Sequence, residues 1–403
     1  MVEIVRGLDG VVITETRLSR VDGDAGELLI SGFPLAELAP RARFEETLFL
    51  LWNDRLPDAD EEAVLRRSLA AARPLPPAAL EVLHAAAAAR LAPMDALRIG
   101  LAALGLGDPG LHRTELHRES AEANQERAVH LVAALPSLAA AYHRLSRRCE
   151  PIPPDPALRH AENYLWMLAG ERPDPARTRA LETYLNATVD HGMNASTFTA
   201  RVIASTRSDL ASAVTGALGA LKGPLHGGAP GPALDMLCAV REQARASGRP
   251  LAGLTEDWVC ERVARGERIM GFGHRVYRVR DPRADVLGAA MERLFPSRGG
   301  SPLYDDARTV EEAVLRTLER LKPGRRLHTN VEFYTALLLQ SLGIEPELFT
   351  PTFAVARIAG WTAHVLEQVA EDRLIRPRVA YAGPAERGWV PREERHAASR
   401  PAL

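Results

Sequence analysis

Hydrophobic and polar residues follow the period of an α-helix over most of the chain. Within residues 1–40 they instead follow the period of a β-strand around the turn-prone sequence DGDAG at 22–26, which predicts a small hairpin or ribbon. Aromatic residues make up only 5% of the chain, and β-branched runs are short, so helices are favoured over strands elsewhere. We therefore expect an all-α protein with a short β-ribbon near its N-terminus.

Helix boundaries are predicted from start and stop signals. An Asp-Pro pair places a capping side chain before a proline at the first helical position, and a glycine suits the stop. Starts are predicted at Asp155, Asp174, Asp281, the capping-box sequence beginning at Thr309, and Asn330. Stops are predicted at Gly170 and Gly343, and we expect Pro136 to kink a long helix over 117–147.

Length, charge and cysteine content narrow the class of protein. The chain has 403 residues, so two domains or one large helical body are expected. A net charge of −2 argues against a general nucleic-acid binder. The three cysteines are widely spaced and form neither a disulfide framework nor a zinc motif. The start is polar, and no apolar run approaches the ~20 residues of a membrane helix. We expect a cytoplasmic protein with neither a nucleic-acid nor a membrane partner.

Five segments interrupt the helical pattern with glycine, histidine and arginine. Functional side chains often lie at such junctions, because the backbone groups there are free to bind a ligand. The segments are DHGMNAST (190–197), LKGPLHGGAP (221–230), MGFGHRVYRVRDPRA (270–284), NVEFY (330–334) and ARIAGW…LIRPR (356–378).

The histidines and the acid in these segments have ordinary interpretations beside functional ones. His226 lies in a glycine-rich turn, where a surface histidine is the commoner case, and His274 follows GFG, a weak signal for phosphate binding. His191 lies near a helix end, where the dipole favours a cation. Glu332 lies about two residues into its helix, where the dipole favours a carboxylate and where a rigid helix would also direct a general base.

The arginines offer a further possibility. Arg283, Arg357 and Arg376 are each more often surface residues, but three converging guanidinium groups would trap a dicarboxylate by bidentate pairing. The sequence alone leaves their convergence open. HExxH, paired HxH, calcium-loop, Walker A and GxSxG patterns do not occur, so metal binding is disfavoured.

Taken together, the five segments resemble the citrate synthase family, in whose order and spacing they occur. Two N-terminal segments, FEETLFLLWNDRLP (44–57) and APMDALRIGLAALG (92–105), are also similar to family segments. The resemblance covers about residues 7–383.

This resemblance implies a two-domain helical fold. The large domain, which would form the interface of an obligate homodimer, comprises residues 1–225 and 335–383. A smaller inserted helical domain of residues 226–334 would lie on the coenzyme A side, and residues 384–403 would form a tail. The active site is expected between the domains.

The resemblance also implies a role for each candidate residue. His226 matches the histidine that hydrogen-bonds the acyl-CoA carbonyl, and His274 the histidine that polarises the oxaloacetate carbonyl. Glu332 falls at the position of the base, usually Asp, that removes the acyl proton. The matches to oxaloacetate ligands are His191, Arg283, Arg357 and, reaching the neighbouring subunit's site, Arg376. The matches to the coenzyme A site are Met270, Gly271, Phe272, Gly273 and Arg278.

The implied reaction condenses acetyl-CoA with oxaloacetate and water to give citrate and free coenzyme A, without a metal or redox cofactor. A 2-methylcitrate synthase using propionyl-CoA and a family member that has lost catalysis stay open as alternatives. A metal-dependent hydrolase using His191, His226 and His274 is disfavoured. Glu332 departs from the family by one methylene, which shifts a carboxylate by about 1 Å, and Gly192 stands where many relatives carry Glu. We expect no regulation by NADH.

Overall fold

The computed structural model describes residues 4–8, 10–227, 230–274, 276–297 and 300–394. It contains two compact units, of which the larger is Thr16–Ile375 and the smaller combines Met1–Glu15 with Arg376–Leu403. In the smaller unit, the described part contains two short 3-10 helices, Arg6–Leu8 and Arg392–Glu394. The tail predicted at 384–403 is irregular over 384–391, and residues 395–403 lie outside the described residues.

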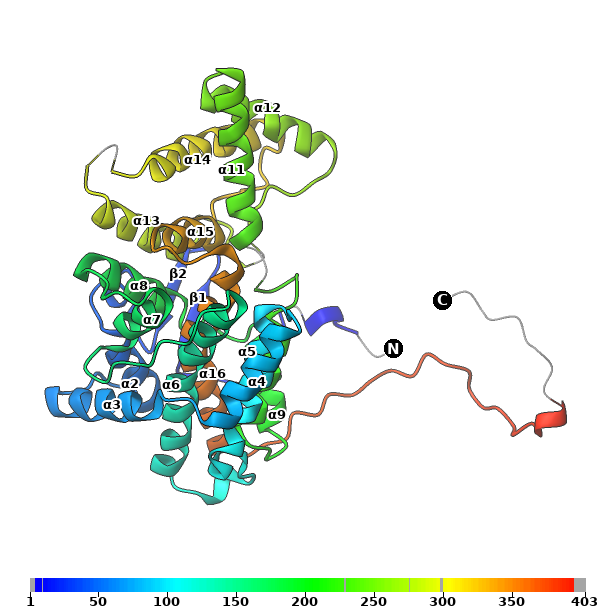
Figure 1. The fold of residues 1–403 in the computed structure, drawn as a ribbon. Coiled ribbons are helices and arrows are strands. Elements are labelled where there is room, and N and C mark those ends of the chain that lie inside the picture. Colours follow the sequence, from blue (N-terminus) through cyan, green and yellow to red (C-terminus); the bar gives the residue numbers. More distant parts are fainter. Residues whose placement is uncertain (1–3, 9, 228–229, 275, 298–299, 395–403) are drawn as a thin grey trace. The chain divides into compact units, whose positions relative to one another are not determined.

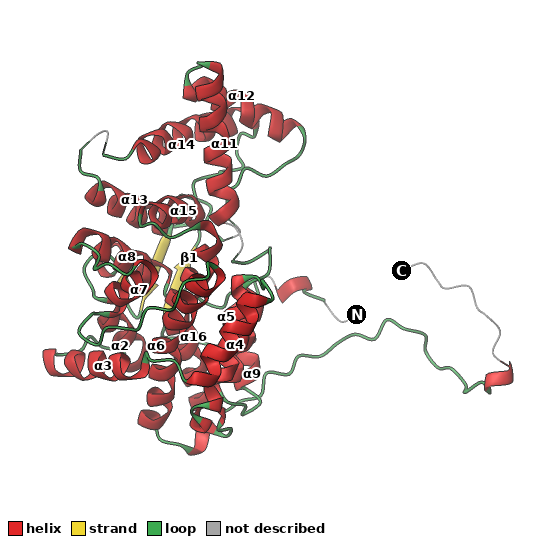
Figure 2. Cartoon of the chain, in the orientation of Figure 1, coloured by secondary structure: helices red, strands yellow, loops and turns green. Residues whose placement is uncertain are grey.

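The larger unit consists almost entirely of α-helices (Figure 2), which confirms the expected all-α class. Sixteen α-helices lie among the described residues. They are α1 (Leu35–Leu38), α2 (Phe44–Asn53), α3 (Ala59–Ala72), α4 (Pro77–Ala88), α5 (Pro93–Ala103), α6 (Ala121–Ser146), α7 (His160–Ala169), α8 (Pro175–Thr188), α9 (Ala195–Ala204), α10 (Leu210–Leu221), α11 (Pro230–Ser247), α12 (Leu251–Ala264), α13 (Pro282–Leu294), α14 (Pro302–Leu321), α15 (Val331–Ser341) and α16 (Phe349–Glu371).

The predicted β-ribbon is present near the N-terminus. Strand β1 (Ser19–Asp22) pairs antiparallel with β2 (Glu27–Ile30), and the two-residue β3 (Phe33–Pro34) pairs with β2. The DGDAG turn joins β1 to β2 and packs on the loop before α13. There the N–H of Arg278 donates to the carbonyl of Gly23 at 2.8 Å. A Cβ at Gly23 would overlap the Val276 carbonyl oxygen, so only glycine allows this close approach.

Most predicted helix starts are correct. Asp174, Asp281 and Asn330 cap α8, α13 and α15 with their side chains. Gly170 ends α7 in the left-handed conformation, with φ 80°. Gly343, beyond the end of α15, has φ 73°.

Two predicted starts are wrong. The helix expected at Asp155 begins instead at His160, because Nη1 of Arg73 binds the carbonyls of Asp155 and Leu158 and holds that segment in a turn. The helix expected at Thr309 begins earlier, at Pro302, where Ser301 supplies the cap.

Helix α6 contains Pro136, the proline expected to kink it, and tertiary packing surrounds the helix at that point. It runs as one helix from Ala121 to Ser146 with Pro136 inside it. All residues from Leu131 to Tyr142 are buried, so packing on every side holds this part of the helix.

Helix α16 is the central helix of the larger unit (Figure 1). Nearly every residue from Phe349 to Val365 is buried, as expected for a helix surrounded by others. It packs against α6, α8, α9 and α10. Its side chains therefore meet several segments that are distant in the sequence.

Helices α11 to α15 lie together at one end of this unit (Figure 1). Helix α12 packs on α14, and α13 packs on both α15 and α8. The division into domains at residues 226 and 334 stays a prediction.

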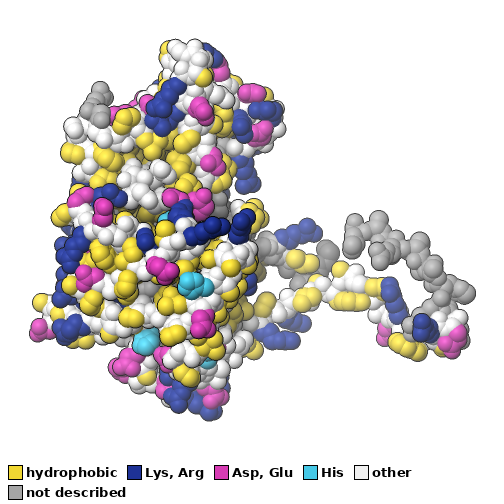
Figure 3. Space-filling model, viewed as in Figure 1, with side chains coloured by type: hydrophobic (Ala, Val, Ile, Leu, Met, Phe, Trp, Pro, Cys, Tyr) yellow, Lys and Arg dark blue, Asp and Glu magenta, His cyan; other side chains and the backbone are white. Residues whose placement is uncertain are grey.

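Charged side chains of both signs are mixed on the face in Figure 3. Among the described residues, no helix combines the length and apolar character needed to cross a bilayer.

Candidate active site

His226 lies in the turn between α10 and α11, as predicted. Two backbone hydrogen bonds fix the turn, from the N–H of His226 to the Gly223 carbonyl and from the N–H of Gly227 to the Leu221 carbonyl, both 2.9 Å. The His226 Nε2 lies 2.8 Å from the hydroxyl of Ser196 and accepts the backbone N–H of Ser196 at 3.3 Å. Because Nε2 accepts an N–H, the proton of the neutral ring is on Nδ1.

Ser196, which orients His226, is itself held in place. Its hydroxyl accepts the indole N–H of Trp361 at 3.1 Å and lies 2.8 Å from the amide oxygen of Asn194. Burial, followed by the charge of Arg357, lowers the pKa of His226 to about 4. His226 is therefore a neutral hydrogen-bond donor at Nδ1 near neutral pH.

His274 is fixed by the loop that follows it. Its Nδ1 accepts the backbone N–H groups of Val276 and Tyr277, each at 3.0 Å, which places the ring proton on Nε2. That nitrogen lies 3.3 Å from Nη2 of Arg283. Because both atoms then carry protons, this is a close approach and not a hydrogen bond. Burial and then Arg283 lower the pKa of His274 to about 4, so this ring is also neutral.

Arg283 is anchored by a buried carboxylate. Its Nε and Nη2 donate to the two oxygens of Asp281, at 3.0 and 2.8 Å. Asp281 also accepts the N–H of Val331, at the start of α15, at 3.2 Å. The Asp281–Arg283 pair therefore connects the starts of α13 and α15, and α15 carries Glu332.

His191 lies beside His274, with 5.8 Å between ring centroids. Its Nε2 is 3.1 Å from the Tyr277 hydroxyl. Burial lowers the pKa of His191 well below its usual range, and Arg283, Arg357 and His274 add to the effect. Two neutral histidines and a phenol hydroxyl therefore lie together, and the charge of Arg357 acts on both His191 and His226.

Arg357 enters the site from α16. Its Nε donates to the Thr188 carbonyl at 2.7 Å, and its guanidinium lies over the Phe353 ring at 4.7 Å. Burial lowers the pKa of Arg357 to about 10, so the group stays charged at neutral pH. Among the described residues, no hydrogen bond or ion pair engages its two Nη groups, which leaves that end available to an anion.

Glu332 completes the cluster. Its backbone N–H donates to the capping side chain of Asn330 at 3.0 Å. Burial raises the pKa of its carboxyl to about 7, although Arg283 and Arg357 both oppose the rise. The charges of Arg283 and Arg357 thus affect the pKa values of both Glu332 and His191. These two arginines of the predicted anion trap therefore belong to the same site.

Arg376, the third predicted arginine, belongs to the smaller unit and is exposed. Its proposed role in a neighbouring subunit stays a prediction.

The MGFG turn lies against the start of α15. Gly271 and Gly273 both have φ 84°, a conformation that favours glycine. The Gly271 carbonyl accepts the N–H of Asn330 at 3.0 Å, and the Gly273 carbonyl accepts the Asn330 side chain at 2.8 Å. Phe272 and Met270 flank the turn, and Arg278 is exposed. The turn is thus fixed next to Glu332, and its contact with coenzyme A stays a prediction.

Sequence reasoning missed three residues that shape this site. Asp281 was predicted only as a helix cap, although its position two residues before Arg283 also allows the ion pair. Ser196 lies within DHGMNAST, and nothing in that pattern links it to His226. Tyr277 lies three residues after His274 in the sequence. Nothing in that spacing indicates its contact with His191, which is far from it along the chain.

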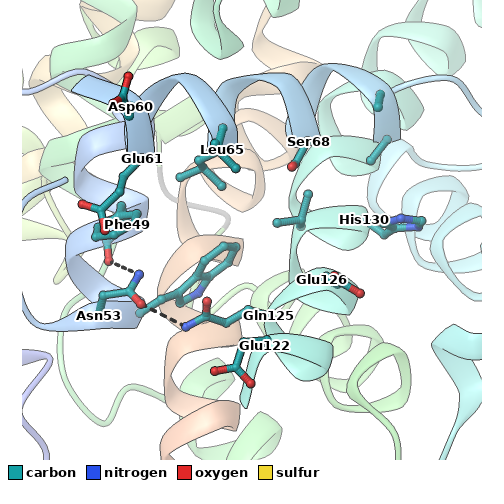
Figure 4. Close-up of a pocket in the computed structure, with 15 residues that line it drawn as sticks. Phe49, Asn53, Asp60, Glu61, Leu65, Ser68, Glu122, Gln125, Glu126 and His130 are labelled. Atoms are coloured by element: carbon teal, nitrogen blue, oxygen red, sulfur yellow. Dashed lines mark hydrogen bonds between the residues drawn. The ribbon is translucent and has the colours of Figure 1, made fainter. Parts of the chain in front are cut away.

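A separate cavity of about 670 Å³ lies between α2, α3 and α6 (Figure 4). Phe49 and Leu65 contribute apolar walls, and Glu122, Gln125 and Glu126 lie along the α6 side. None of the predicted site residues lines it. Among the described residues, no three histidine, cysteine or acidic side chains are grouped as a metal site.

Known proteins resemble this chain over nearly its whole length. The family described as "Citrate synthase, C-terminal domain" matches residues 7–378. The citrate synthase of Haloferax volcanii is 41% identical over 98% of this chain and 99% of its own length. The 2-methylcitrate synthase of Mycobacterium tuberculosis is 37% identical over 96% of this chain and 92% of its own length. The structure of citrate synthase from Thermoplasma acidophilum, in ternary complex with carboxymethyl coenzyme A and oxaloacetate, has a TM-score of 0.84 at 28% identity and covers 98% of this chain and 100% of its own.

Proposed function

The chain belongs to the citrate synthase family of acyltransferases, and we propose that it condenses acetyl-CoA with oxaloacetate and water to give citrate and free coenzyme A. The observation that carries this proposal is the grouping of Glu332, with its raised pKa, with neutral histidines and two buried arginines. Proton abstraction from a thioester needs a base together with a hydrogen-bond donor on the carbonyl. The following assignments apply that requirement to this chain.

The first step is enolisation of the acyl group. The Glu332 carboxylate takes a proton from the acyl carbon, and the Nδ1–H of His226 donates to the thioester oxygen as it gains negative charge. A base with a pKa near the working pH is efficient at both accepting and releasing the proton. Because His226 is neutral before and after donating this hydrogen bond, its position matters more than its charge.

The second step is addition to oxaloacetate. Arg283 and Arg357 bind its carboxylates, and His191 contributes a further polar contact. The Nε2–H of His274 polarises the ketone and transfers a proton to the new alkoxide. Glu332 then releases the proton that it took from the acyl carbon and His274 regains one, so the protons balance over the cycle. Water then cleaves the thioester and releases coenzyme A. Fixed cationic groups orient the dianion as well as bind it.

The acyl donor has one plausible alternative. The resemblance to the Mycobacterium tuberculosis protein named 2-methylcitrate synthase supports propionyl-CoA as a second candidate donor. Thiol release should be measured with oxaloacetate and each acyl-CoA in turn. We expect higher kcat/KM with acetyl-CoA, whereas a clear preference for propionyl-CoA would reverse the assignment. Release with neither donor would refute the proposed function.

We further propose a cytoplasmic homodimer that needs no metal or redox cofactor. The homodimer is what membership of the citrate synthase family implies. Arg376 would reach the neighbouring active site. Light scattering tests the dimer, and full activity in a chelator tests the absence of a metal. In mixed dimers, an Arg376→Ala subunit should impair its partner's site rather than its own.

A further inference from the structure

We propose that His364, together with Asp190, is a positioning residue that holds His191 in place for oxaloacetate. This inference rests on the proposed function, because it assigns a role to residues next to the oxaloacetate site. Both side chains are fully buried. Neither belongs to the group that would touch substrate, so their role would be to fix the geometry of those that do.

The first observation is the contact between the two side chains. Nε2 of His364 lies 3.2 Å from Oδ1 of Asp190. The ring N–H is poorly aligned with this oxygen, so neither atom has a hydrogen-bond partner among the described residues and the 3.2 Å contact is an electrostatic one. An unsatisfied buried polar group costs about 1–3 kcal/mol, so each atom depends on the other. The backbone of Asp190 continues directly into His191.

The second observation fixes the direction of the ring. Nη1 of Arg201 lies 3.2 Å from the other ring nitrogen, Nδ1 of His364. A guanidinium has donors only, so Nδ1 accepts and the proton on Nε2 faces Asp190. Arg201 is fully buried, and its charge is balanced by Glu367 at 2.6 Å and Glu371 at 3.3 Å, while the amide oxygen of Gln368 accepts its Nε–H at 2.9 Å. The Arg201 guanidinium, on the side of the His364 ring away from Asp190, thus sets the orientation of the ring.

The third observation concerns the remaining contacts of the Asp190 carboxylate. Its Oδ2 accepts the hydroxyl of Ser19, on β1, at 2.5 Å and the N–H of Gly192 at 3.2 Å. His191 therefore lies between Asp190, which supplies this carboxylate, and Gly192, whose backbone N–H binds it. Burial opposes ionisation, yet His364, Arg357 and Ser19 lower the pKa of Asp190 to about 2, so the carboxylate is ionised at neutral pH.

The fourth observation is that one face of α16 carries three of the supports. Arg357 binds the Thr188 carbonyl, Trp361 binds the Ser196 hydroxyl, and His364 contacts Asp190. Residues at this spacing share a helix face. At Gly360, between the first two, a Cβ would overlap the Val189 carbonyl oxygen. The helix therefore presents Arg357 to substrate and sets the positions of His191 and His226 relative to it.

The test compares three substitutions on α16. His364→Leu removes the donor to Asp190, whereas His364→Gln keeps an N–H donor at a similar reach. Thr362→Val is the matched control, because Thr362 is buried on the same helix and its hydroxyl accepts the Trp52 indole N–H at 3.2 Å and donates to the backbone of α16 rather than to residues 188–196. Oxaloacetate affinity is measured by calorimetry, and thiol release gives kcat and KM.

We expect His364→Leu to weaken oxaloacetate binding about tenfold or more, since a displacement of about 1 Å is costly at a preorganised site. The KM for acyl-CoA should change much less. His364→Gln should recover much of the loss, and Thr362→Val should leave oxaloacetate affinity unchanged while lowering thermal stability. Unchanged affinity in His364→Leu, or an equal loss in Thr362→Val, would overturn the proposal.

A second variant keeps the test valid if His364→Leu does not fold. Ser19→Ala removes another hydrogen bond to Asp190 from the start of an edge strand. It should weaken oxaloacetate binding about threefold to tenfold, and unchanged affinity would again overturn the proposal. A wild-type protein that binds oxaloacetate but releases no thiol would refute the proposed function alone, because the affinity comparison does not require turnover.

Discussion

The backbone N–H of Ser196 donates to Nε2 of His226 at 3.3 Å, and this contact determines which nitrogen of His226 carries its proton. The Ser196 hydroxyl, 2.8 Å from the same nitrogen, holds the ring at that angle. A group that donates to a developing oxyanion must have its proton on the correct nitrogen before the reaction begins. Ser196 should therefore affect catalysis without touching substrate.

Ser196→Ala is expected to lower kcat for thiol release by about tenfold, because the ring loses its side-chain support but keeps the backbone donor. The KM for oxaloacetate should change little. Ser137→Ala is a suitable control, since Ser137 is a buried serine of α6 whose hydroxyl contacts the sulfur of Met167 at 3.6 Å. Equal losses of kcat in the two variants would contradict the role given to Ser196.

The pH profile should be governed by Glu332. Its pKa of about 7 lies well above the values of about 4 for His226 and His274. The base must be ionised, so kcat/KM should rise tenfold per pH unit below about 7 and level off above it. Steady-state assays from pH 5.5 to 8.5 would show this limb. A flat profile across that range would exclude Glu332 as the base.

Substitution of Glu332 separates charge from length. Glu332→Gln removes the base and should lower kcat by about 10²–10⁴-fold. Glu332→Asp restores the length usual in the family and should keep substantial activity. If Glu332→Gln retained near wild-type turnover, the assignment would be wrong.

Glu332→Gln should also change stability in a pH-dependent way. The folded pKa is raised from 4.5 to about 7, so ionisation disfavours the folded state. This penalty is absent below pH 4.5, grows between the two values and is complete above about 7. The variant should therefore be more stable than wild type at pH 8, by about 3 kcal/mol, and equal to it at pH 4. Thermal melts at the two pH values provide the measurement.

Asp281→Asn should weaken oxaloacetate binding and destabilise the fold. Asp281 and Arg283 form a buried pair with side chains 0% and 5% exposed, and removal of one partner from such a pair costs about 3–5 kcal/mol. Asp285→Asn is the matched control. Asp285 pairs with Arg280 but is 61% exposed, so its loss should cost less than about 1 kcal/mol. Denaturant unfolding and calorimetry would distinguish the two variants.

Gly360→Ala should disturb the site from within α16. The new Cβ would overlap the Val189 carbonyl oxygen and lie 2.9 Å from Oδ1 of Asp190. We expect a loss of about 1–3 kcal/mol in unfolding free energy and weaker oxaloacetate binding. Gly253→Ala, where α12 has open space, should instead be neutral or slightly stabilising. Similar behaviour of both variants would show that the close approach at Gly360 is unimportant.

The sequence predicts the helices and the candidate site residues better than it predicts the contacts that orient those residues. Helix caps such as Asp174 and Asn330 depend on neighbours two or three residues away, so local patterns reveal them. The failed start at Asp155 depends on Arg73, which is distant in the sequence and satisfies its carbonyls. The contacts of His364 with Asp190 and of Ser196 with Trp361 likewise join remote segments. No local spacing encodes such contacts.

The docking of the β1–β2 hairpin has a consequence for biosynthesis. Ser19 binds Asp190, 171 residues later, and the hairpin turn packs on a loop further along the chain. At a synthesis rate of about 5–20 residues per second, Ser19 waits on the order of ten to thirty seconds for its partner. The β1–β2 hairpin thus gains these contacts with distant segments only after those segments have been synthesised. A ribosome-bound chain truncated before α13 would expose this hairpin to chaperones.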